Sequence, residues 1–474
     1  MFGLDFRQAA QVMGARTWGR DLGRQADRPL PRVVIDSRQV KPGDCFFAIK
    51  GDRLDGHDFL EAAMERGAAL GVCSRTPDLD AGAFEDRIIL RVADTTRALQ
   101  ELAAELRRRW GRSLVGVTGS MGKTTTRTFT ARLLESGHQV LQSPANFNNA
   151  FGVPLSLLRL EERHDLAVLE LGMNHAGEIR RLARICRPDL AVITNVAPVH
   201  LEFFSSVDEI ARAKGEILED MPAAGVFVYN ADDHRVAGLA SAFHGRRVSF
   251  SLERNADVQV TDVRVVDSSS TRFILRAGWG ESSCRVAFVG RHHLYNLAAA
   301  VAAARTLGLS REQIEGAIPS LSPLPMRGKI RGLEMSGSRR IRILDDSYNS
   351  NPQAVRMALE TVGQSAGAGR RILALGEMLE LGPESAVWHR RVGRMAARIE
   401  PHLLAAVGAG ARPFLEGARE AGLADGRTLY FGTSEEAAEY LCGFICSGDF
   451  LLIKGSRGVG MERIAALLEE GKGA

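Results

Sequence analysis

A short apolar strand, a turn with two glycines and a helix start follow one another in residues 112–126, and no other segment restricts the fold as strongly. Leu114–Val117 is predicted to be a strand, and Gly119 and Gly122 lie in the turn after it. Lys123 and three threonines then open a helix. Glycine allows the backbone to curl so that its N–H groups and the helix N-terminus face an anion. The segment therefore predicts a strand–loop–helix unit with an anion site at the strand end.

The anion expected at this turn is the phosphate tail of a nucleotide. Lys123 is predicted to reach the β- and γ-phosphates, and Thr124 to offer its hydroxyl to Mg²⁺. The eight-residue P-loop pattern requires glycine at position 117, where this chain has valine, so only the shorter Gly-x-x-Gly-Lys-Thr form is present. An ordinary strand–turn–helix junction is the alternative, but it would not explain why two glycines, a lysine and a threonine occur together here. We predict a nucleoside-triphosphate site formed by Thr118, Gly119, Ser120, Met121, Gly122, Lys123, Thr124 and Thr125.

Composition limits the classes to which the chain can belong. At 474 residues it is too long for a single core, and two to four domains are expected. Its formal charge is +4, and its 61 basic and 57 acidic residues are well mixed, without a basic run, which argues against nucleic-acid binding. Its six cysteines include no C-x-x-C pair, which indicates thiols in a reducing compartment. With no membrane-length apolar run and no signal-peptide pattern, we expect a cytoplasmic protein that does not enter a membrane.

Apolar strands alternate with helices along most of the chain, in the rhythm of parallel sheets covered on both faces. We expect α/β domains at residues 1–93, 94–321 and 322–474. The first is predicted to contain a hairpin whose strands, at 32–36 and 45–49, are joined by a turn at 41–44. After a helix at 95–110, the second is predicted to contain strands at 114–117, 166–170, 190–195 and 225–229, with an antiparallel extension between 248 and 289. A proline-rich linker at 319–325 leads to a third domain with strands at 341–345, 371–376, 403–408, 429–432 and 450–454.

Three side chains near these strand ends are candidates for chemistry, because open α/β sheets bind ligands at the C-terminal ends of their strands. Glu170 ends a strand, where a carboxylate can hold Mg²⁺ beside a nucleotide, and a solvated glutamate is the alternative. His200 follows the next strand, and Lys214 is expected on a helix. By residue type alone, a structural histidine and a solvent-facing lysine are the more common outcomes.

Several further segments share a pattern with one enzyme family. Besides the glycine loop, they are 146–155 (Asn-Phe-Asn-Asn-Ala-Phe-Gly-Val-Pro-Leu), 170–178, His200 with 213–217, 345–352 (Asp-Asp-Ser-Tyr-Asn-Ser-Asn-Pro), 375–382 and 454–457. Together they resemble the Mur ligases of peptidoglycan synthesis, and among these the branch that adds D-alanyl-D-alanine. The resemblance extends from about Asp36 to Met461. Segments 146–155 and 345–352 are particular to that branch, and the Asp-Asn-Pro-Arg motif of the tripeptide-forming branch is absent.

The resemblance implies a small N-terminal UDP-MurNAc-binding domain, a central parallel-sheet P-loop ATPase domain and a Rossmann-like C-terminal ligase domain. It implies that a monomer ligates UDP-MurNAc-tripeptide with D-Ala-D-Ala through an acyl phosphate, using ATP and two Mg²⁺ ions. Glu170 and His200 match Mg²⁺ ligands, together with Thr124, and Lys214 matches a lysine carried as a carbamate. Lys123, His200 and Lys214 form the implied catalytic set. The residues that match further ATP contacts are Asn296, Arg327 and Asp346.

The resemblance also suggests which residues contact the other substrates. Ser37 and Arg38 are expected at the diphosphate or uridine of the UDP-sugar. The remaining substrate-binding candidates are Asn146, Asn148, Asn149, Tyr348, Asn349, Lys454, Ser456 and Arg457. Asn351, just before Pro352, can instead be a simple helix N-cap.

Two other functions are weighed against this one. Folylpolyglutamate synthetase uses the same short loop and carboxylate activation, but it lacks the 146–155 and 345–352 segments and the N-terminal sugar domain. A nucleotide-hydrolysing switch is an alternative of a different class. It leaves the third domain and the set Glu170, His200 and Lys214 without a role.

Overall fold

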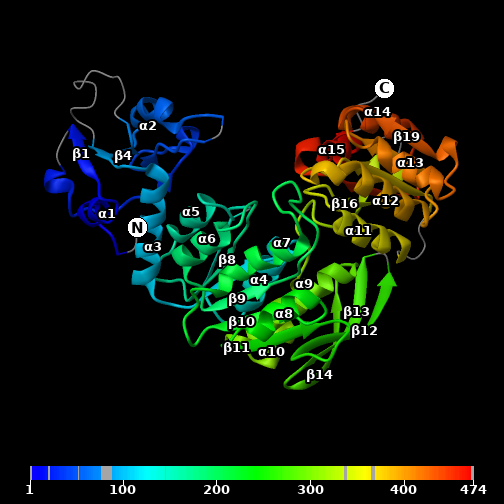
Figure 1. Cartoon of the computed structure of the whole chain (residues 1–474), viewed down its shortest axis with the longest axis horizontal. Coiled ribbons are helices and arrows are strands. Elements are labelled where there is room, and N and C mark those ends of the chain that lie inside the picture. The colour runs from blue at the N-terminus through cyan, green and yellow to red at the C-terminus, as the bar shows by residue number, and fades with distance from the viewer. Residues whose placement is uncertain are drawn as a thin grey trace. The chain divides into compact units, whose positions relative to one another are not determined.

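The computed structural model of the chain describes residues 3–19, 22–51, 53–75, 88–144, 146–267, 269–335, 339–364 and 369–470. The chain groups into two compact units, one made of Met1–Thr118, Gly137–Val192 and Gly215–Phe227, the other of Gly119–Ser136, Ile193–Lys214 and Val228–Ala474. The described residues form three β-sheets, and Figure 1 labels many of their strands and helices. The expected α/β class is confirmed, whereas the predicted domain bounds remain a prediction.

The first sheet has the strand order β1-β5-β4-β3-β2. These strands are β1 (Arg16–Gly19), β2 (Val33–Val34), β3 (Cys45–Phe47), β4 (Leu70–Cys73) and β5 (Ile88–Arg91). The helices nearby are α1 (Phe6–Val12) and α2 (Leu60–Glu65). Strands β2 to β5 pair in parallel, and β1 pairs antiparallel with β5.

The predicted hairpin in this sheet is wrong, because β2 and β3 pair in parallel, with Val33 opposite Cys45. After β2 the chain enters a 3₁₀ turn at Ser37–Gln39, whose N-cap is the Asp36 side chain. This turn and the following turn before Asp44 carry the chain back, so that β3 starts at the same end as β2. A turn signal between two strands therefore did not reveal their relative direction.

The second sheet follows α3 (Thr95–Trp110), which confirms the helix predicted there. The Asp94 side chain caps the start of α3, and Gly111 ends it with a left-handed backbone. Every residue of β6 (Leu114–Thr118), β8 (Leu166–Glu170) and β9 (Leu190–Ile193) is buried, and β6 and β7 (Val140–Gln142) both pair in parallel with β8. Buried strands of this kind are covered on both faces.

The strand order of this sheet is β14-β13-β12-β11-β10-β9-β6-β8-β7. The antiparallel extension is confirmed for β12 (Val258–Asp267), β13 (Ser270–Ala277) and β14 (Gly280–Val286). In contrast, β11 (Arg246–Ser251) pairs in parallel with β12, and β10 is Val226–Asn230. The helices of this part are α4 (Lys123–Leu134), α5 (Gly152–Leu157), α6 (Glu178–Cys186), α7 (Val207–Gly215), α8 (His234–Ala242), α9 (Arg291–Thr306) and α10 (Arg311–Ala317).

The third sheet has the order β15-β16-β20-β17-β18-β19 and is parallel except for the edge pair β15–β16. Its strands are β15 (Lys329–Met335), β16 (Arg339–Asp346), β17 (Arg371–Gly376), β18 (Leu403–Val407), β19 (Thr428–Phe431) and β20 (Phe450–Lys454). The edge strand β15 was not predicted. Only Leu333 and Met335 of this strand are buried, so it carries the weak apolar pattern of an edge.

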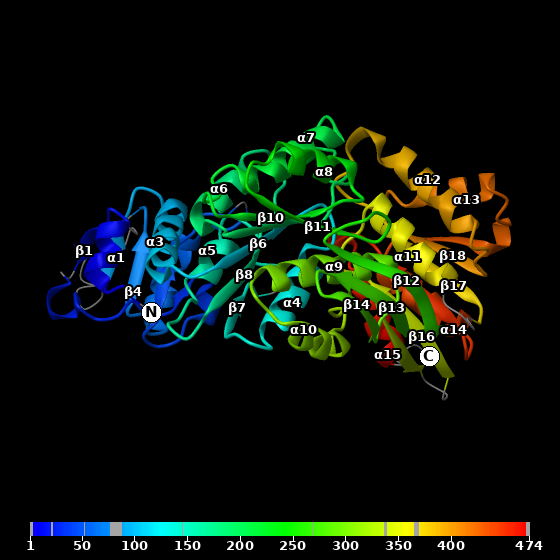
Figure 2. The same ribbon diagram turned by 90° about the horizontal axis from the view of Figure 1, so that it is seen from below.

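Alternating side chains of the third sheet build two cores. Phe450 and Leu452 of β20 belong to one apolar cluster, and Leu451 and Ile453 belong to the other. The first cluster is covered by α11 (Pro352–Gln364), α12 (Ser385–Ala397) and α13 (Arg412–Glu420), the second by α14 (Ser434–Phe444) and α15 (Glu462–Glu470). Figure 2 shows these helices on the two sides of the sheet. A continuous apolar strand such as β20 is therefore buried on both faces.

No helix within the described ranges is long and apolar enough to cross a membrane.

Candidate active site

The predicted glycine loop joins β6, which ends at Thr118, to α4, which begins at Lys123. Gly119 has a φ of 145°, and a Cβ added there would lie 1.9 Å from Thr194 Oγ1. Gly122 has a φ of 78°, and its added Cβ would lie 2.2 Å from Asn296 Oδ1. Neither position can take a side chain without displacing its neighbour, so both glycines are required by the loop itself.

Residues at the end of β9 anchor this loop from outside. The Ser120 and Met121 N–H groups donate to Asn195, to its carbonyl at 2.9 Å and to its Oδ1 at 3.0 Å. Thr194 Oγ1 donates to the Met121 carbonyl at 2.6 Å. The sequence reasoning missed Thr194 and Asn195. The available signal was their position at the C-terminal end of the predicted strand 190–195, which the structure ends at Ile193.

The start of α4 gathers the predicted phosphate-binding side chains. Lys123 Nζ donates to the carbonyls of Gly119 at 2.8 Å and Ser120 at 3.3 Å, so the ammonium lies over the loop. Thr124 and Thr125 are buried in the first turn of α4. The N-terminal end of α4, which carries the positive end of the helix dipole, therefore borders the loop, as an anion site requires.

Asn296 approaches the same loop from α9. It is buried, and its Oδ1 accepts a hydrogen bond from Thr126 Oγ1 at 3.2 Å. With the contact to Gly122 described above, this places a predicted nucleotide residue next to the loop. His293, one turn earlier on α9, is also buried, and burial and the neighbouring His292 hold its pKa well below the ordinary value.

Glu170 ends β8, and its register partner on β6 is Val117. Its Oε1 accepts a hydrogen bond from Asn148 Nδ2 at 2.8 Å, and its backbone N–H donates to Ser143 Oγ at 3.0 Å. Its Oε2 is buried and has no hydrogen-bond partner in the described part of the chain. A buried carboxylate oxygen without a partner needs a ligand, and an anionic oxygen is the donor type that Mg²⁺ prefers. Glu170 therefore fits a magnesium ligand.

The asparagines before α5 have local partners. Asn148 holds Glu170, as described above. Asn149 Oδ1 accepts the N–H groups of Phe151 and Gly152, at 3.2 and 2.9 Å, so it holds the turn that leads into α5. Asn146 is exposed. The predicted substrate roles of these three asparagines remain predictions.

His200 has a left-handed backbone, with a φ of 55°. Its Nδ1 lies 2.6 Å from Glu380 Oε2, in the loop after β17. The hydrogen bond with His200 lowers the pKa of Glu380 from its ordinary value. Glu380 was missed as an individual residue, although the segment 375–382 is among those that carry the family resemblance.

Lys214 lies in α7 and is only 2% exposed, so the solvent-facing alternative is wrong. Burial, followed by the charge of Lys123, places the pKa of Lys214 well below its ordinary value. Burial therefore favours the neutral form of the Lys214 amine, which is the nucleophilic form. Among the described residues, no three His, Cys, Asp or Glu side chains gather at one point. A Mg²⁺ ion here would depend on few protein ligands, with phosphate and water oxygens completing its shell.

Predicted residues of the third sheet form a second polar cluster. Lys454 is 1% exposed in its side chain, and its Nζ lies 2.5 Å from Asp346 Oδ2 and donates to the Asn349 carbonyl at 3.0 Å. The guanidinium of Arg327 stacks on the Tyr348 ring at 3.7 Å. Lys454 is therefore already paired, and its partner Asp346 is one of the predicted nucleotide contacts.

The other predicted residues of this sheet are tied to local structure. Buried Ser456 accepts the Leu379 N–H at 2.9 Å through its Oγ. Arg457 pairs with Glu462 at 3.0 Å and lies 5.7 Å from the Tyr348 ring centre. Asn351 acts as the helix N-cap considered above, since its Oδ1 accepts the Ala354 N–H at 2.9 Å at the start of α11.

In the first sheet, Ser37 and Arg38 lie in the 3₁₀ turn after β2. Arg38 makes a two-pronged contact with Asp36, at 2.9 Å for each nitrogen, and its side chain is 83% exposed. Arg38 is therefore accessible, with its guanidinium held in one orientation, and Ser37 is partly exposed.

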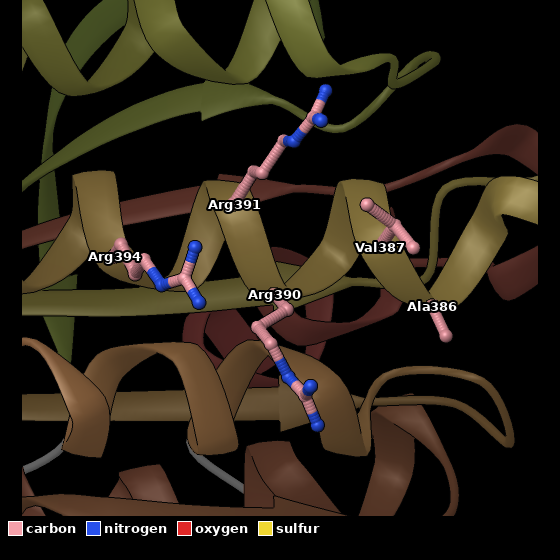
Figure 3. Close-up of a pocket in the computed structure, with 5 residues that line it drawn as sticks. All are labelled: Ala386, Val387, Arg390, Arg391 and Arg394. Carbon is pink, nitrogen blue, oxygen red and sulfur yellow. The ribbon is translucent and has the colours of Figure 1, made fainter.

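A separate hollow lies on α12, away from the predicted residues. It is lined by Ala386, Val387, Arg390, Arg391 and Arg394. In Figure 3, Arg390 and Arg391 point to opposite sides of the helix. Arg390 and Arg394 pair with glutamates of α13, and Arg391 lies over the Trp388 ring, so two of the three cations in this hollow are neutralised.

A loop that requires glycines and joins a parallel strand to a helix N-terminus is typical of nucleotide-binding α/β enzymes. Comparison with known families makes this class specific. The chain matches "Mur ligase family, catalytic domain" at residues 31–107, "Mur ligase middle domain" at 117–304 and "Mur ligase, glutamate ligase domain" at 332–457. The chain belongs to the Mur ligase family.

Individual relatives are similar over almost their full length. UDP-N-acetylmuramoyl-tripeptide–D-alanyl-D-alanine ligase of Escherichia coli K12 is 34% identical, over 94% of this chain and 95% of the relative. The crystal structure of MurF from Acinetobacter baumannii has a TM-score of 0.86 at 32% identity and covers 98% of both chains. MurF from Thermotoga maritima in complex with ADP has a TM-score of 0.80 at 28% identity, over 93% of this chain and 98% of that one.

Proposed function

We propose that this chain is an ATP-dependent ligase that joins D-alanyl-D-alanine to UDP-MurNAc-tripeptide and so forms UDP-MurNAc-pentapeptide for peptidoglycan. The observation that carries the proposal is the similarity to the E. coli ligase of that name, at 34% identity over 95% of its length. The geometry of the Gly119–Gly122 loop supports it independently, because the loop is built to receive a phosphate chain. The proposal extends to the domain bounds 1–93, 94–321 and 322–474, for the UDP-sugar, ATP and ligase domains.

The chemistry begins with a carboxylate, which is a poor acyl donor because its leaving group would be oxide. The tripeptide carboxylate attacks the γ-phosphorus of ATP, releases ADP and becomes an acyl phosphate. Two anions meet in this step, so Lys123 has to offset the charge that develops on the transferring phosphoryl oxygens. The free amine of D-Ala-D-Ala then attacks the acyl carbon, and phosphate leaves as the amide forms.

Magnesium binding is proposed on the donor set described above. Glu170, through its unpartnered Oε2, together with Thr124 and His200 would hold two Mg²⁺ ions. When bound, Mg²⁺ neutralises phosphate charge and orients the γ-phosphoryl group. Asn148 supports this role by holding the other Glu170 oxygen, which leaves Oε2 free for the metal.

Lys214 is proposed to be carbamylated. Its neutral amine nitrogen would attack the carbon of CO₂, form an N–C bond and lose one proton, which produces an anion in place of an amine. The burial of Lys214 and its position near the charge of Lys123 support this, because an anion there would be stabilised by the lysine that faces the phosphates.

ATP contacts from other elements are proposed for Asn296, Arg327 and Asp346. Asn296 touches the loop at Gly122, and the guanidinium of Arg327 lies over the Tyr348 ring. Since Lys454 pairs with Asp346, we assign it to the nucleotide side of the site. Ser37 and Arg38 are proposed for the UDP-sugar. The remaining substrate contacts are proposed for Asn146, Asn148, Asn149, Tyr348, Asn349, Ser456 and Arg457.

Phosphate release, measured with UDP-MurNAc-tripeptide and ATP in the presence and absence of D-Ala-D-Ala, tests this function. We expect release that depends on both co-substrates and a product with two added alanines by mass spectrometry. Free D-alanine should react far more slowly, because it places its carboxylate too close to its amine for the same donors. Phosphate release without any acceptor would favour the nucleotide switch, and glutamate addition to a folate would favour the folylpolyglutamate activity. Monomeric and cytoplasmic states are part of the proposal, and sedimentation and cell fractionation test them.

A further inference from the structure

The loop after β17 is held in place residue by residue. The Glu377 carboxylate accepts the Gly410 N–H at 3.0 Å. The Met378 N–H donates to Nε2 of the buried His389 at 2.9 Å, and the Leu379 N–H donates to Ser456 Oγ at 2.9 Å. Three consecutive residues are thus anchored, and the next residue is Glu380. A side chain on such a support is presented in a defined direction.

Glu380 meets His200 in an unusual backbone geometry. The two residues have φ values of 61° and 55°, and they are two of the six non-glycine residues with positive φ in the described part of the chain. Such a conformation costs about 1–3 kcal/mol and persists only where the surroundings enforce it. Here both strained residues lie at the two ends of one hydrogen bond, 2.6 Å between His200 Nδ1 and Glu380 Oε2. A second contact, from the Glu202 N–H to the Glu380 carbonyl at 3.4 Å, joins the same loops.

The chemistry of the pair fixes the histidine ring. An ionised carboxylate only accepts hydrogen bonds, so His200 Nδ1 carries the proton and Nε2 carries the lone pair. The structure gives Nε2 no hydrogen bond within the described ranges. Metal-binding histidines characteristically donate their other N–H to a carboxylate, which orients the ring and raises its basicity.

We propose that Glu380 is a positioning residue for His200: it fixes the tautomer and directs Nε2 toward the magnesium that accompanies ATP. This inference rests on the proposed function, in which His200 is a metal ligand. It gives the segment 375–382 a role in metal binding, although the segment itself contributes no metal ligand. Glu380 lies in the loop after β17, whereas His200 follows β9, so the metal site depends on a residue 180 positions away in sequence.

The competing interpretation is an ordinary exposed ion pair. The Glu380 side chain is 46% exposed and that of His200 is 19% exposed, and a pair of that kind contributes about 0–1 kcal/mol to stability. Loss of such a pair would change melting slightly and leave metal affinity unchanged. Metal affinity is therefore the measurement that separates the two.

The test uses three variants of the full chain. Glu380→Gly removes the carboxylate and tolerates the positive φ, so backbone strain cannot explain its effect. Glu380→Gln retains an oxygen that can accept the Nδ1 proton. Glu384→Ala changes an exposed glutamate four residues away and serves as the matched control. Binding of Mn²⁺ in the presence of ADP is measured by electron paramagnetic resonance, without any turnover.

We expect Glu380→Gly to weaken Mn²⁺ binding by about 10–100-fold, Glu380→Gln to weaken it less, and Glu384→Ala to match the parent. In turnover, the Mg²⁺ concentration for half-maximal rate should rise in Glu380→Gly while the KM for D-Ala-D-Ala stays constant. Mn²⁺ affinity of Glu380→Gly within about twofold of the parent would overturn the inference, as would equal weakening in the control. Failure of the parent to ligate would instead overturn the proposed function, because the binding measurement does not depend on ligation.

Discussion

Replacing Lys454 by methionine should destabilise the third sheet strongly, because it leaves Asp346 without its cation. The Lys454 side chain is 1% exposed, that of Asp346 is 20% exposed, and their charged atoms lie 2.5 Å apart. Breaking a buried pair by removing one partner costs about 3–5 kcal/mol, and the partial exposure of Asp346 places this case near about 3 kcal/mol. With a urea dependence of about 2 kcal/mol per molar, the unfolding midpoint of this domain should fall by about 1.5 M.

The assay is urea unfolding followed by circular dichroism, together with steady-state kinetics. The double variant Lys454→Met with Asp346→Asn should recover at least about 1 kcal/mol relative to Lys454→Met alone, because the remaining side chain is no longer charged. Lys329→Met, at an exposed position of β15, should behave like the parent. The KM for ATP should rise more than the KM for D-Ala-D-Ala. A midpoint shift below about 0.5 M would refute the reasoning about the ion pair. A rise confined to the KM for D-Ala-D-Ala would refute the assignment of Lys454 to the nucleotide side and indicate that it binds the dipeptide carboxylate.

Three further predictions concern single residues. Lys123→Ala should ligate at less than about a tenth of the parent rate while remaining folded, and a loss below about 1.4 kcal/mol in activation free energy would exclude its role at the phosphates. Lys214→Ala should lose activity, with partial recovery on addition of short carboxylates, and full activity at saturating Mg²⁺ would show that no carbamate is needed. His389 is buried, and burial lowers its pKa from 6.5, so the unfolded chain takes up its proton first as the pH falls. Below pH 6.5 the free energy of unfolding should therefore fall by up to about 1.4 kcal/mol per pH unit. In urea unfolding between about pH 7.5 and 5.5, the His389→Gln variant should lose less stability than the parent. Equal loss in the two proteins would contradict this prediction.

The parts of this protein that sequence predicted well are those specified by neighbouring residues. The glycine loop could be predicted because two glycines, a lysine and threonines act within one turn of chain. The helix at 95–110 matched its bounds because Asp94 and Gly111 cap it locally. Strands such as β8 and β20 were predicted because continuous apolar runs are buried on both faces.

What could not be predicted depends on distant partners. The contact of Glu380 with His200 joins residues 180 positions apart, and nothing in either local sequence indicates the other. The parallel pairing of β2 with β3 depends on the path of the chain between them, and two strands with a turn signal fit either direction. The ion pair of Lys454 with Asp346 joins residues 108 positions apart, and the sequence shows the lysine without indicating its partner.

The central claim is that ATP activates the tripeptide carboxylate as an acyl phosphate, and isotope transfer tests it most directly. UDP-MurNAc-tripeptide is prepared with a heavy oxygen isotope in the reacting carboxylate and is incubated with ATP, Mg²⁺ and D-Ala-D-Ala. If the carboxylate takes the γ-phosphoryl group, one labelled oxygen should leave with each phosphate released, and the amide product should retain the other. Unlabelled phosphate accompanying the pentapeptide product would contradict the acyl phosphate, and phosphate without any pentapeptide would contradict the ligase function itself.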